Sequence, residues 1–195
     1  MSERRLPAPE RRRQLLDVAV QVFANRGYHG ASMNQVAEAA GVTKPVLYQH
    51  FPSKRALFHD VLEDVGSRLE DAITKATAAA EGPRQQVEAG FRTYFAWVDG
   101  NRASFAVLFG GATGPEEDFV ATALRVESTI ADAIAALIVV DGLDAEGRRV
   151  VAHGLVGIAE STSRHWMTHD LDLDPEVLAT QAAELAWAGL RGIRR

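Results

Sequence analysis

Apolar side chains recur along most of this chain at intervals of three and four residues, which is the period of an α-helix. The clearest stripe lies between residues 53 and 80 and consists of Leu57, Val61, Leu62, Val65, Leu69 and Ile73. The strict alternation of apolar and polar residues that is typical of a half-buried strand is almost absent. The sequence therefore predicts an all-α protein.

Glycine, proline and capping residues divide this pattern into successive helices. The first predicted helix opens at Pro9 and stops at Asn25-Arg26-Gly27, and two short helices occupy residues 32–51. The other predicted helices cover about residues 53–80, 83–98, 102–109, 116–140, 144–168 and 176–193. A chain of 195 residues suffices for one domain or for a small domain joined to a larger one.

Residues 32–51 predict two short helices joined by a tight turn. Ser32 is expected to cap the first helix, and Gly41 supplies the left-handed conformation that ends it. Thr43 is the expected cap of the second helix, with Pro45 in its first turn. This is the geometry of a helix-turn-helix whose second helix enters the major groove of DNA.

The side chains of the second short helix divide into two faces. Leu47 and Phe51 are four residues apart and are expected to point inward. The opposite face is available to bases and phosphates and carries Lys44, Pro45, Tyr48 and Gln49. Ser53 then caps the next helix, where Lys54 and the first backbone amides are expected to bind a phosphate.

The order Ala-Gly-Val-Thr-x-Pro-x-Leu-Tyr-x-His-Phe-x-Ser-Lys-x-x-Leu-Phe, which begins at Ala40, closely resembles the DNA-binding domain of TetR/AcrR-family transcriptional regulators. The resemblance implies a three-helix DNA-binding head in residues 1–53 and a larger helical ligand-binding and dimerisation domain in residues 54–195. One departure is Met33, where many members carry threonine. Carried over by position, the residues implied at the DNA are Ser32, Thr43, Lys44, Pro45, Tyr48, Gln49, His50 and Lys54. For His50 the alternative is a half-buried residue that orients its neighbours.

Charge is distributed unevenly along the chain. The net charge of −5 is unusual for a DNA-binding protein, but residues 1–60 have a net charge of +4 and residues 61–195 a net charge of −9. The basic charge is therefore concentrated on the segment that carries the helix-turn-helix. The asymmetry favours specific binding of double-stranded DNA over general coating of nucleic acid.

The composition bears on location and chemistry. The sequence has no run of eighteen apolar residues, no signal-peptide pattern and no cysteine, which together indicate a cytoplasmic protein with no membrane partner. No cofactor or metal is predicted. The enzyme motifs Gly-x-Ser-x-Gly and His-Glu-x-x-His are absent. One alternative stays open, a metal site made of His165, His169 and a carboxylate such as Glu160.

Aromatic residues are frequent between residues 87 and 170, where the ligand domain is expected. They form a core or line an apolar cavity between helices, and they include Phe119. The candidate ligand-binding residues are Phe91, Tyr94, Phe95, Trp97, Arg102, Phe105, Phe109, Thr162, His165 and Trp166, with Ser161 as a further polar candidate. An apolar or lipid-like small-molecule effector fits this set better than a cationic one.

A homodimer is expected because one recognition helix reads few base pairs and a two-fold axis supplies a second half-site. The resemblance implies that the last two long helices pair across this axis. The candidate interface residues are Leu155, Ile158, Leu178, Ala182 and Leu185.

The function that best fits these features is a repressor that binds an inverted-repeat operator and is released by its effector. One alternative keeps the fold but makes the protein an effector-dependent activator or an accessory DNA-binding dimer. Another is a small-molecule carrier or enzyme with a vestigial head, which would bind its ligand tightly but show no salt-dependent binding of DNA.

Overall fold

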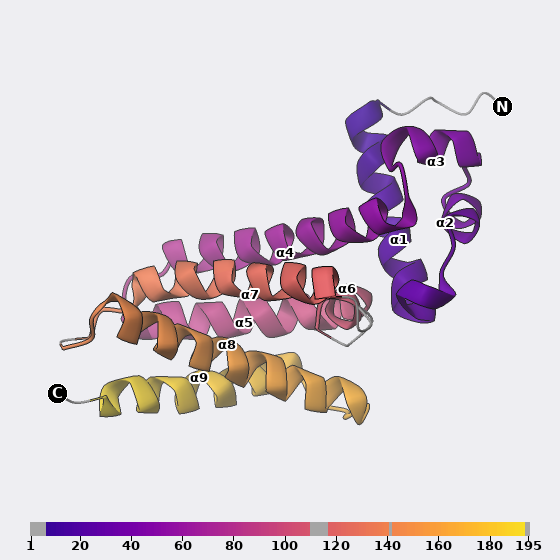
Figure 1. Ribbon diagram of the computed structural model, residues 1–195. Coiled ribbons are helices and arrows are strands. Elements are labelled where there is room, and N and C mark those ends of the chain that lie inside the picture. Colours follow the sequence, from indigo (N-terminus) through magenta and orange to yellow (C-terminus); the bar gives the residue numbers. More distant parts are fainter. Residues whose placement is uncertain (1–6, 110–116, 141, 194–195) are drawn as a thin grey trace. The chain divides into compact units, whose positions relative to one another are not determined.

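The computed structural model describes residues 7–109, 117–140 and 142–193, and within these ranges it is all-α, as predicted (Figure 1). None of the helices in these ranges combines the length and the apolar character needed to cross a lipid bilayer. The helices are α1 (Ala8–Gly30), α2 (Met33–Ala39), α3 (Lys44–His50), α4 (Lys54–Ala78), α5 (Pro83–Gly100), α6 (Arg102–Leu108), α7 (Glu117–Leu137), α8 (Ala145–Thr168) and α9 (Pro175–Gly192).

The chain divides into two compact units. The first unit comprises Met1–Val65 and Ala103–Ala123, and the second comprises Gly66–Arg102 and Leu124–Arg195. The first unit therefore contains the predicted head, residues 1–53, together with the first part of α4, nearly all of α6 and the beginning of α7. Helices α4 and α7 each contribute residues to both units.

The predicted helix boundaries rest on local hydrogen bonds. The Ser32 hydroxyl accepts from the backbone N–H of Gln35, and the Gln35 side chain accepts from the N–H of Ser32, so the two residues form a capping box on α2. Gly41 has a φ of 65° and ends α2. Ser53 Oγ accepts from the N–H of Ala56 at 3.1 Å and so caps α4.

The end of α1 differs from the prediction. Gly27 adopts a φ of 65°, which interrupts the regular helix where the sequence placed its end. One more turn follows, because the N–H of Ala31 donates to the carbonyl of Gly27 at 3.2 Å. Tyr28, which follows the predicted end of this helix, lies in the extra turn and is buried in the core of the first unit.

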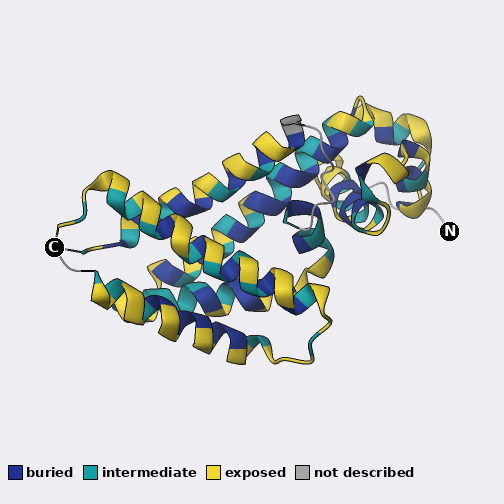
Figure 2. Cartoon of the chain, turned by 60° about the horizontal axis from the view of Figure 1, so that its bottom comes forward, coloured by how far each residue is buried: buried dark blue, intermediate teal, exposed yellow. Residues whose placement is uncertain are grey.

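Helices α5, α8 and α9 pack on one another in the second unit, and α5 and α9 lie side by side over much of their length (Figure 1). Each helix buries one stripe and exposes the other side (Figure 2). The buried stripe of α5 carries Phe91, Tyr94, Phe95 and Val98, and that of α9 carries Leu178, Ala179, Ala182, Ala183 and Ala186. The small alanine side chains let α9 pack closely along α5.

Helices α4 and α7 approach each other closely at Gly66. A Cβ atom added to Gly66 would lie 2.3 Å from Cγ1 of Val126 and 2.8 Å from its Cγ2. Valine is stiff in a helix, so it cannot turn its methyl groups away without strain.

We therefore expect Gly66→Ala to lower the free energy of unfolding. Overpacking costs about 1–3 kcal/mol, which outweighs the gain of about 1 kcal/mol in helix propensity. Chemical denaturation measures the change, and the Gly66→Ala/Val126→Ala double variant is the control. Because the second change removes the clashing methyls, the double variant should lose less than the sum of the two single changes. Wild-type stability in Gly66→Ala would contradict the close approach.

Candidate nucleic-acid interface and ligand site

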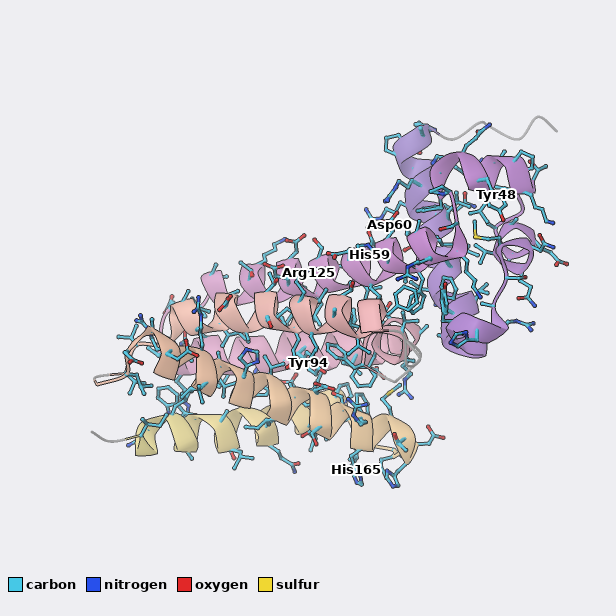
Figure 3. The ribbon with its side chains drawn as sticks, in the orientation of Figure 1. Tyr48, His59, Asp60, Tyr94, Arg125 and His165 are labelled. Atoms are coloured by element: carbon cyan, nitrogen blue, oxygen red, sulfur yellow. The ribbon has the colours of Figure 1, made fainter. Side chains whose placement is uncertain are left out.

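Two buried side chains anchor helix α3 to the core of the head, and most of its other side chains are exposed. Leu47 and Phe51 are 0% exposed, as their spacing predicted. The predicted DNA-facing residues Lys44, Pro45, Tyr48 and Gln49 are exposed, and Tyr48, which is labelled in Figure 3, is 47% exposed. The helix thus presents a cation, a phenol and an amide to solvent on a rigid support.

The residues that flank α3 differ in their surroundings. Thr43 occupies the N-cap position of α3, as predicted, but its hydroxyl makes no capping hydrogen bond. His50 is half-buried beside Phe51, with 6.3 Å between the ring centroids. Ser32 is exposed, and its hydroxyl belongs to the capping box of α2. Met33 is buried and therefore packs inside the head.

Lys54 has an internal role that the sequence did not indicate. Its Nζ donates to the carbonyl oxygens of Tyr28 at 2.8 Å and Ala31 at 3.0 Å, and it lies 4.4 Å from the centroid of the Tyr28 ring. The ammonium group thus satisfies carbonyls at the end of α1 and ties α4 to the turn before α2. An ammonium group has three donors, and two of them are used in these hydrogen bonds.

An ion pair also ties α1 to α4 in the first unit. Arg12 pairs with Asp60 at 2.8 Å, and its guanidinium lies 5.1 Å from the centroid of the Phe51 ring. The side chain therefore covers the residue that anchors the end of α3. Figure 3 shows Asp60 on α4, next to His59.

Phe119 belongs to the core of the first unit, not to the aromatic set of the ligand domain in which its sequence position placed it. It is 1% exposed, and its ring centroid lies 4.6 Å from that of Tyr28 and 4.7 Å from that of Phe58. Tyr28 and Phe58 come from α1 and α4, and Phe23 packs edge-on against Phe58 at 4.8 Å. The first turn of α7 is therefore built into the core beneath the helix-turn-helix.

The second unit brings several predicted ligand residues together. Ring centroids lie 5.4 Å apart for Tyr94 and Phe95, 6.4 Å apart for Phe91 and Phe95, and 6.5 Å apart for Phe95 and Trp166. Arg102 lies 5.4 Å from the centroid of the Trp166 ring. Helices α5 and α8 thus supply one aromatic cluster with a cation at its edge.

Other predicted ligand residues lie outside this cluster. Phe105 and Phe109 belong to the first unit, where their rings pack on each other at 5.4 Å. Trp97 and Thr162 are half-buried, and Ser161 is exposed. The residue of α8 that is buried at this level is Ser163, which is not among the predicted ligand residues.

His165 is exposed (Figure 3), and its ring lies at a tilt to that of His169 with 4.3 Å between the ring centroids. Nδ1 of His169 lies 3.0 Å from the carbonyl oxygen of His165, and Glu160 forms an ion pair with Arg164. Among the described residues, no group of three or more His, Cys, Asp or Glu is placed to hold a metal ion.

The second unit also has a hollow of about 500 Å³ between α5 and α9. Its lining is mainly charged and small, apart from one indole, and includes Arg84, Glu88, Glu184, Trp187, Ala188 and Arg191. None of the predicted ligand residues lines it. The hollow therefore has a different chemistry from the aromatic cluster.

The candidate dimer residues divide between core and surface. Leu178 and Ala182 are 6% and 5% exposed within the single chain. Leu155 and Ile158 of α8 are half-buried. Leu185 is 64% exposed on α9, and Val177 on the same helix is 46% exposed. The exposed apolar surface of α9 therefore includes Leu185 and Val177.

Two family models match the chain. Residues 15–61 match the bacterial regulatory proteins of the tetR family, and residues 83–189 match the tetracyclin repressor-like C-terminal domain. The transcriptional activator FasR of Mycolicibacterium smegmatis is 35% identical over 187 residues, which cover 95% of this chain and 85% of the relative.

Solved structures share the fold. A TetR-like regulator from Rhodococcus sp. RHA1 is 28% identical with a TM-score of 0.78, and the match covers 97% of this chain and all of that one. FadR of Bacillus subtilis, solved in complex with stearoyl-CoA, is 17% identical with a TM-score of 0.81, covering 93% and 99% of the two chains. The exposed face of α3 and these matches agree, and the chain belongs to the TetR family of bacterial transcriptional regulators.

Proposed function

We propose that this regulator binds an inverted-repeat operator as a homodimer, with α3 of each subunit in the major groove. The observation that carries the proposal is the exposed face of α3, with Lys44, Tyr48 and Gln49 held by the buried Leu47. These side chains supply donors and acceptors to base edges and phosphates. The two half-sites lie on one side of the duplex, at multiples of about 34–36 Å.

The flanking residues position the head on the DNA backbone. Ser32 at the start of α2 and Thr43 at the start of α3 are both exposed and bring hydroxyl groups to the phosphates. Lys54 contributes its third donor to a phosphate while its other two hold the end of α1. His50, half-buried, orients the last turn of α3.

Lys44→Ala and Lys54→Ala test these roles. Lys44→Ala is expected to weaken operator binding about tenfold without changing the free energy of unfolding, because Lys44 is exposed and its loss removes a contact to DNA only. Lys54→Ala is expected to weaken binding to any duplex and also to lower the free energy of unfolding by about 1.5–3 kcal/mol, since two charged hydrogen bonds are lost.

Fluorescence anisotropy on operator and scrambled duplexes across a salt series, with chemical denaturation of the same samples, measures both effects. Gln21→Ala on the exposed side of α1 is the control and should change neither quantity. Wild-type operator affinity in both lysine variants would overturn the proposed interface.

The effector is an apolar, acyl-type small molecule that binds to the aromatic cluster of α5 and α8. Rings dominate this cluster, and the polar groups around it are few. The stearoyl-CoA complex of the FadR protein with the same fold supports this ligand class.

Effector binding reaches the head through the two helices that belong to both units, α4 and α7. The ligand binds more tightly to the conformation in which the two heads are not placed to contact both half-sites. It therefore shifts the population of dimers toward the form that does not bind the operator. Because Phe119 at the start of α7 packs between Tyr28 and Phe58, a shift of α7 acts directly on the core of the head.

Dimerisation uses α8 and α9, whose exposed apolar side chains include Val150, Val177 and Leu185. Val150 is 65% exposed on α8. Two copies of such a pair of helices bury these side chains in a four-helix bundle.

We predict repression that the effector relieves. The second candidate is activation, which the name of the Mycolicibacterium smegmatis relative favours. In vitro transcription from a promoter that contains the operator separates the two. Added protein lowers transcript yield in the first case and raises it in the second, and stearoyl-CoA reverses the change in the first.

A further inference from the structure

Two neighbouring buried hydroxyl groups in the second unit have no hydrogen-bond partner apart from each other. They belong to Tyr94 on α5, which is 6% exposed, and to Ser163 on α8, which is 0% exposed. Apart from each other, neither the phenol oxygen nor Ser163 Oγ has a hydrogen-bond partner within the described part of the chain. Figure 3 shows Tyr94 among the side chains that fill the space between the helices.

The surroundings of the two hydroxyl groups are apolar. The lack of a hydrogen-bond partner outside the pair therefore costs free energy. Phe95 packs edge-on against Tyr94, and Phe91 and Trp166 continue the aromatic cluster. Buried polar groups in folded proteins are nearly always paired, because an unpaired one loses its hydrogen bonds to water without replacement. By contrast, the buried hydroxyl of Thr77 in the same unit donates to the carbonyl of Ile73 at 2.9 Å.

The two hydroxyls lie close together and are neutral. Burial raises the pKa of the Tyr94 phenol well above its ordinary value, and the neighbouring Ser163 side chain offsets part of the rise. The phenol therefore keeps its proton and acts as a donor at neutral pH. The nearby charges of Glu160 and Arg164 are paired with each other. Two neutral donors without an unpaired cation suit a neutral acceptor better than a carboxylate.

We propose that Tyr94 and Ser163 form a polar anchor that donates to the carbonyl oxygen of an acyl thioester or ester. The acyl chain then lies along the aromatic rings of α5 and α8. This inference rests on the proposed function, since it takes the effector to be of the acyl type, and it adds the group that the protein recognises and the two residues that recognise it.

The test compares two ligands that differ in one oxygen atom. Stearoyl-CoA has the thioester carbonyl, and S-octadecyl-CoA, a thioether, lacks it. Isothermal titration calorimetry on the full-length protein is expected to show that the thioester binds about tenfold more tightly, since two neutral hydrogen bonds are at stake. In Tyr94→Phe and in Ser163→Ala this preference should fall by about threefold each, and in the double variant it should disappear.

Thr77→Val is the matched control, because it also removes a buried hydroxyl, but one that already has an internal partner. It should leave the preference for the thioester unchanged. Tyr94→Phe and Ser163→Ala should unfold at the same denaturant concentration as the wild type or a higher one, because each removes a buried polar group that has no partner outside the pair.

The remaining outcomes separate this inference from the proposed function. Equal binding of the two ligands by the wild type would overturn the anchor and keep the acyl effector. Tighter binding of stearate than of stearoyl-CoA would overturn it in favour of a charged head group. Failure of all three ligands to bind, with operator binding intact by anisotropy, would overturn the acyl effector and the anchor but not the DNA-binding function.

Discussion

Phe119→Ala is expected to lower the free energy of unfolding by about 3–5 kcal/mol, the usual cost of replacing a buried phenylalanine by alanine. The ring is 1% exposed and lies within 5 Å, centroid to centroid, of both Tyr28 and Phe58. The cavity left by its removal cannot close easily, because Tyr28 and Phe58 sit on the long helices α1 and α4, which cannot move toward each other without disturbing the rest of the head.

The same substitution should alter regulation. If Phe119 transmits the shift of α7 to the head, the variant binds the operator less tightly than the wild type, and added effector changes that affinity less. Phe119→Leu is the graded comparison, since it keeps most of the volume and should lose less stability. Fluorescence anisotropy with and without stearoyl-CoA measures how much the effector changes operator affinity. Chemical denaturation measures the free energy of unfolding.

Val120→Ala is the matched control, one residue further along α7 and 41% exposed. Its effect on stability should stay within about 0.5 kcal/mol. Equal effects of Phe119→Ala and Val120→Ala would show that the ring does not support the head. A destabilised Phe119→Ala variant with an unchanged response to effector would restrict its role to stability.

Leu185→Glu is expected to separate the dimer and to weaken operator binding by about 10²–10⁴-fold, because a single head loses the contribution of the linked second half-site. Leu185 is 64% exposed in the single chain, so the substitution should cost the subunit itself little. At a two-fold interface the change places two buried carboxylates near each other without partners, which strongly disfavours association.

Sedimentation velocity gives the oligomeric state, and anisotropy on the operator gives the affinity. Leu124→Glu on α7 is the control, since Leu124 is a comparably exposed leucine, at 56%, that lies outside α8 and α9. It should remain dimeric and bind the operator normally. A dimeric Leu185→Glu protein with wild-type operator affinity would place the pairing surface elsewhere.

Much of the head could be predicted from the sequence because its signals are local. Ser32 and Gln35 close a capping box within one turn, and the positive φ of Gly41 follows from the residue type. Leu47 and Phe51 are buried, and Tyr48 is exposed, because a helix has only one inward face. Within the described residues the all-α fold follows from the same period in the longer helices.

Tertiary structure decided what depends on neighbours that lie far away in the sequence. Lys54 reads as a surface cation, yet its Nζ is bound by two carbonyls 26 and 23 residues earlier in the chain. Leu178 and Ala182 read equally well as interface or core, and packing along α5 buries them. Periodicity gives the inward side of a helix but not the helix that it meets.

The same limit applies to the sites. Phe119 follows a long aromatic-rich stretch, so its sequence position predicts that it belongs to the ligand domain. In the folded chain it packs instead against Tyr28 of α1 and Phe58 of α4. On α8, Thr162 and Ser163 are adjacent hydroxyl residues about 100° apart around the helix axis. The apolar pattern of this helix is too irregular to show which of the two is buried. The sequence by itself thus determined the helices, their caps and the exposed face of α3, because these depend on residues within one or two turns. Only the tertiary structure decided which side chains meet, because those contacts depend on how the helices pack.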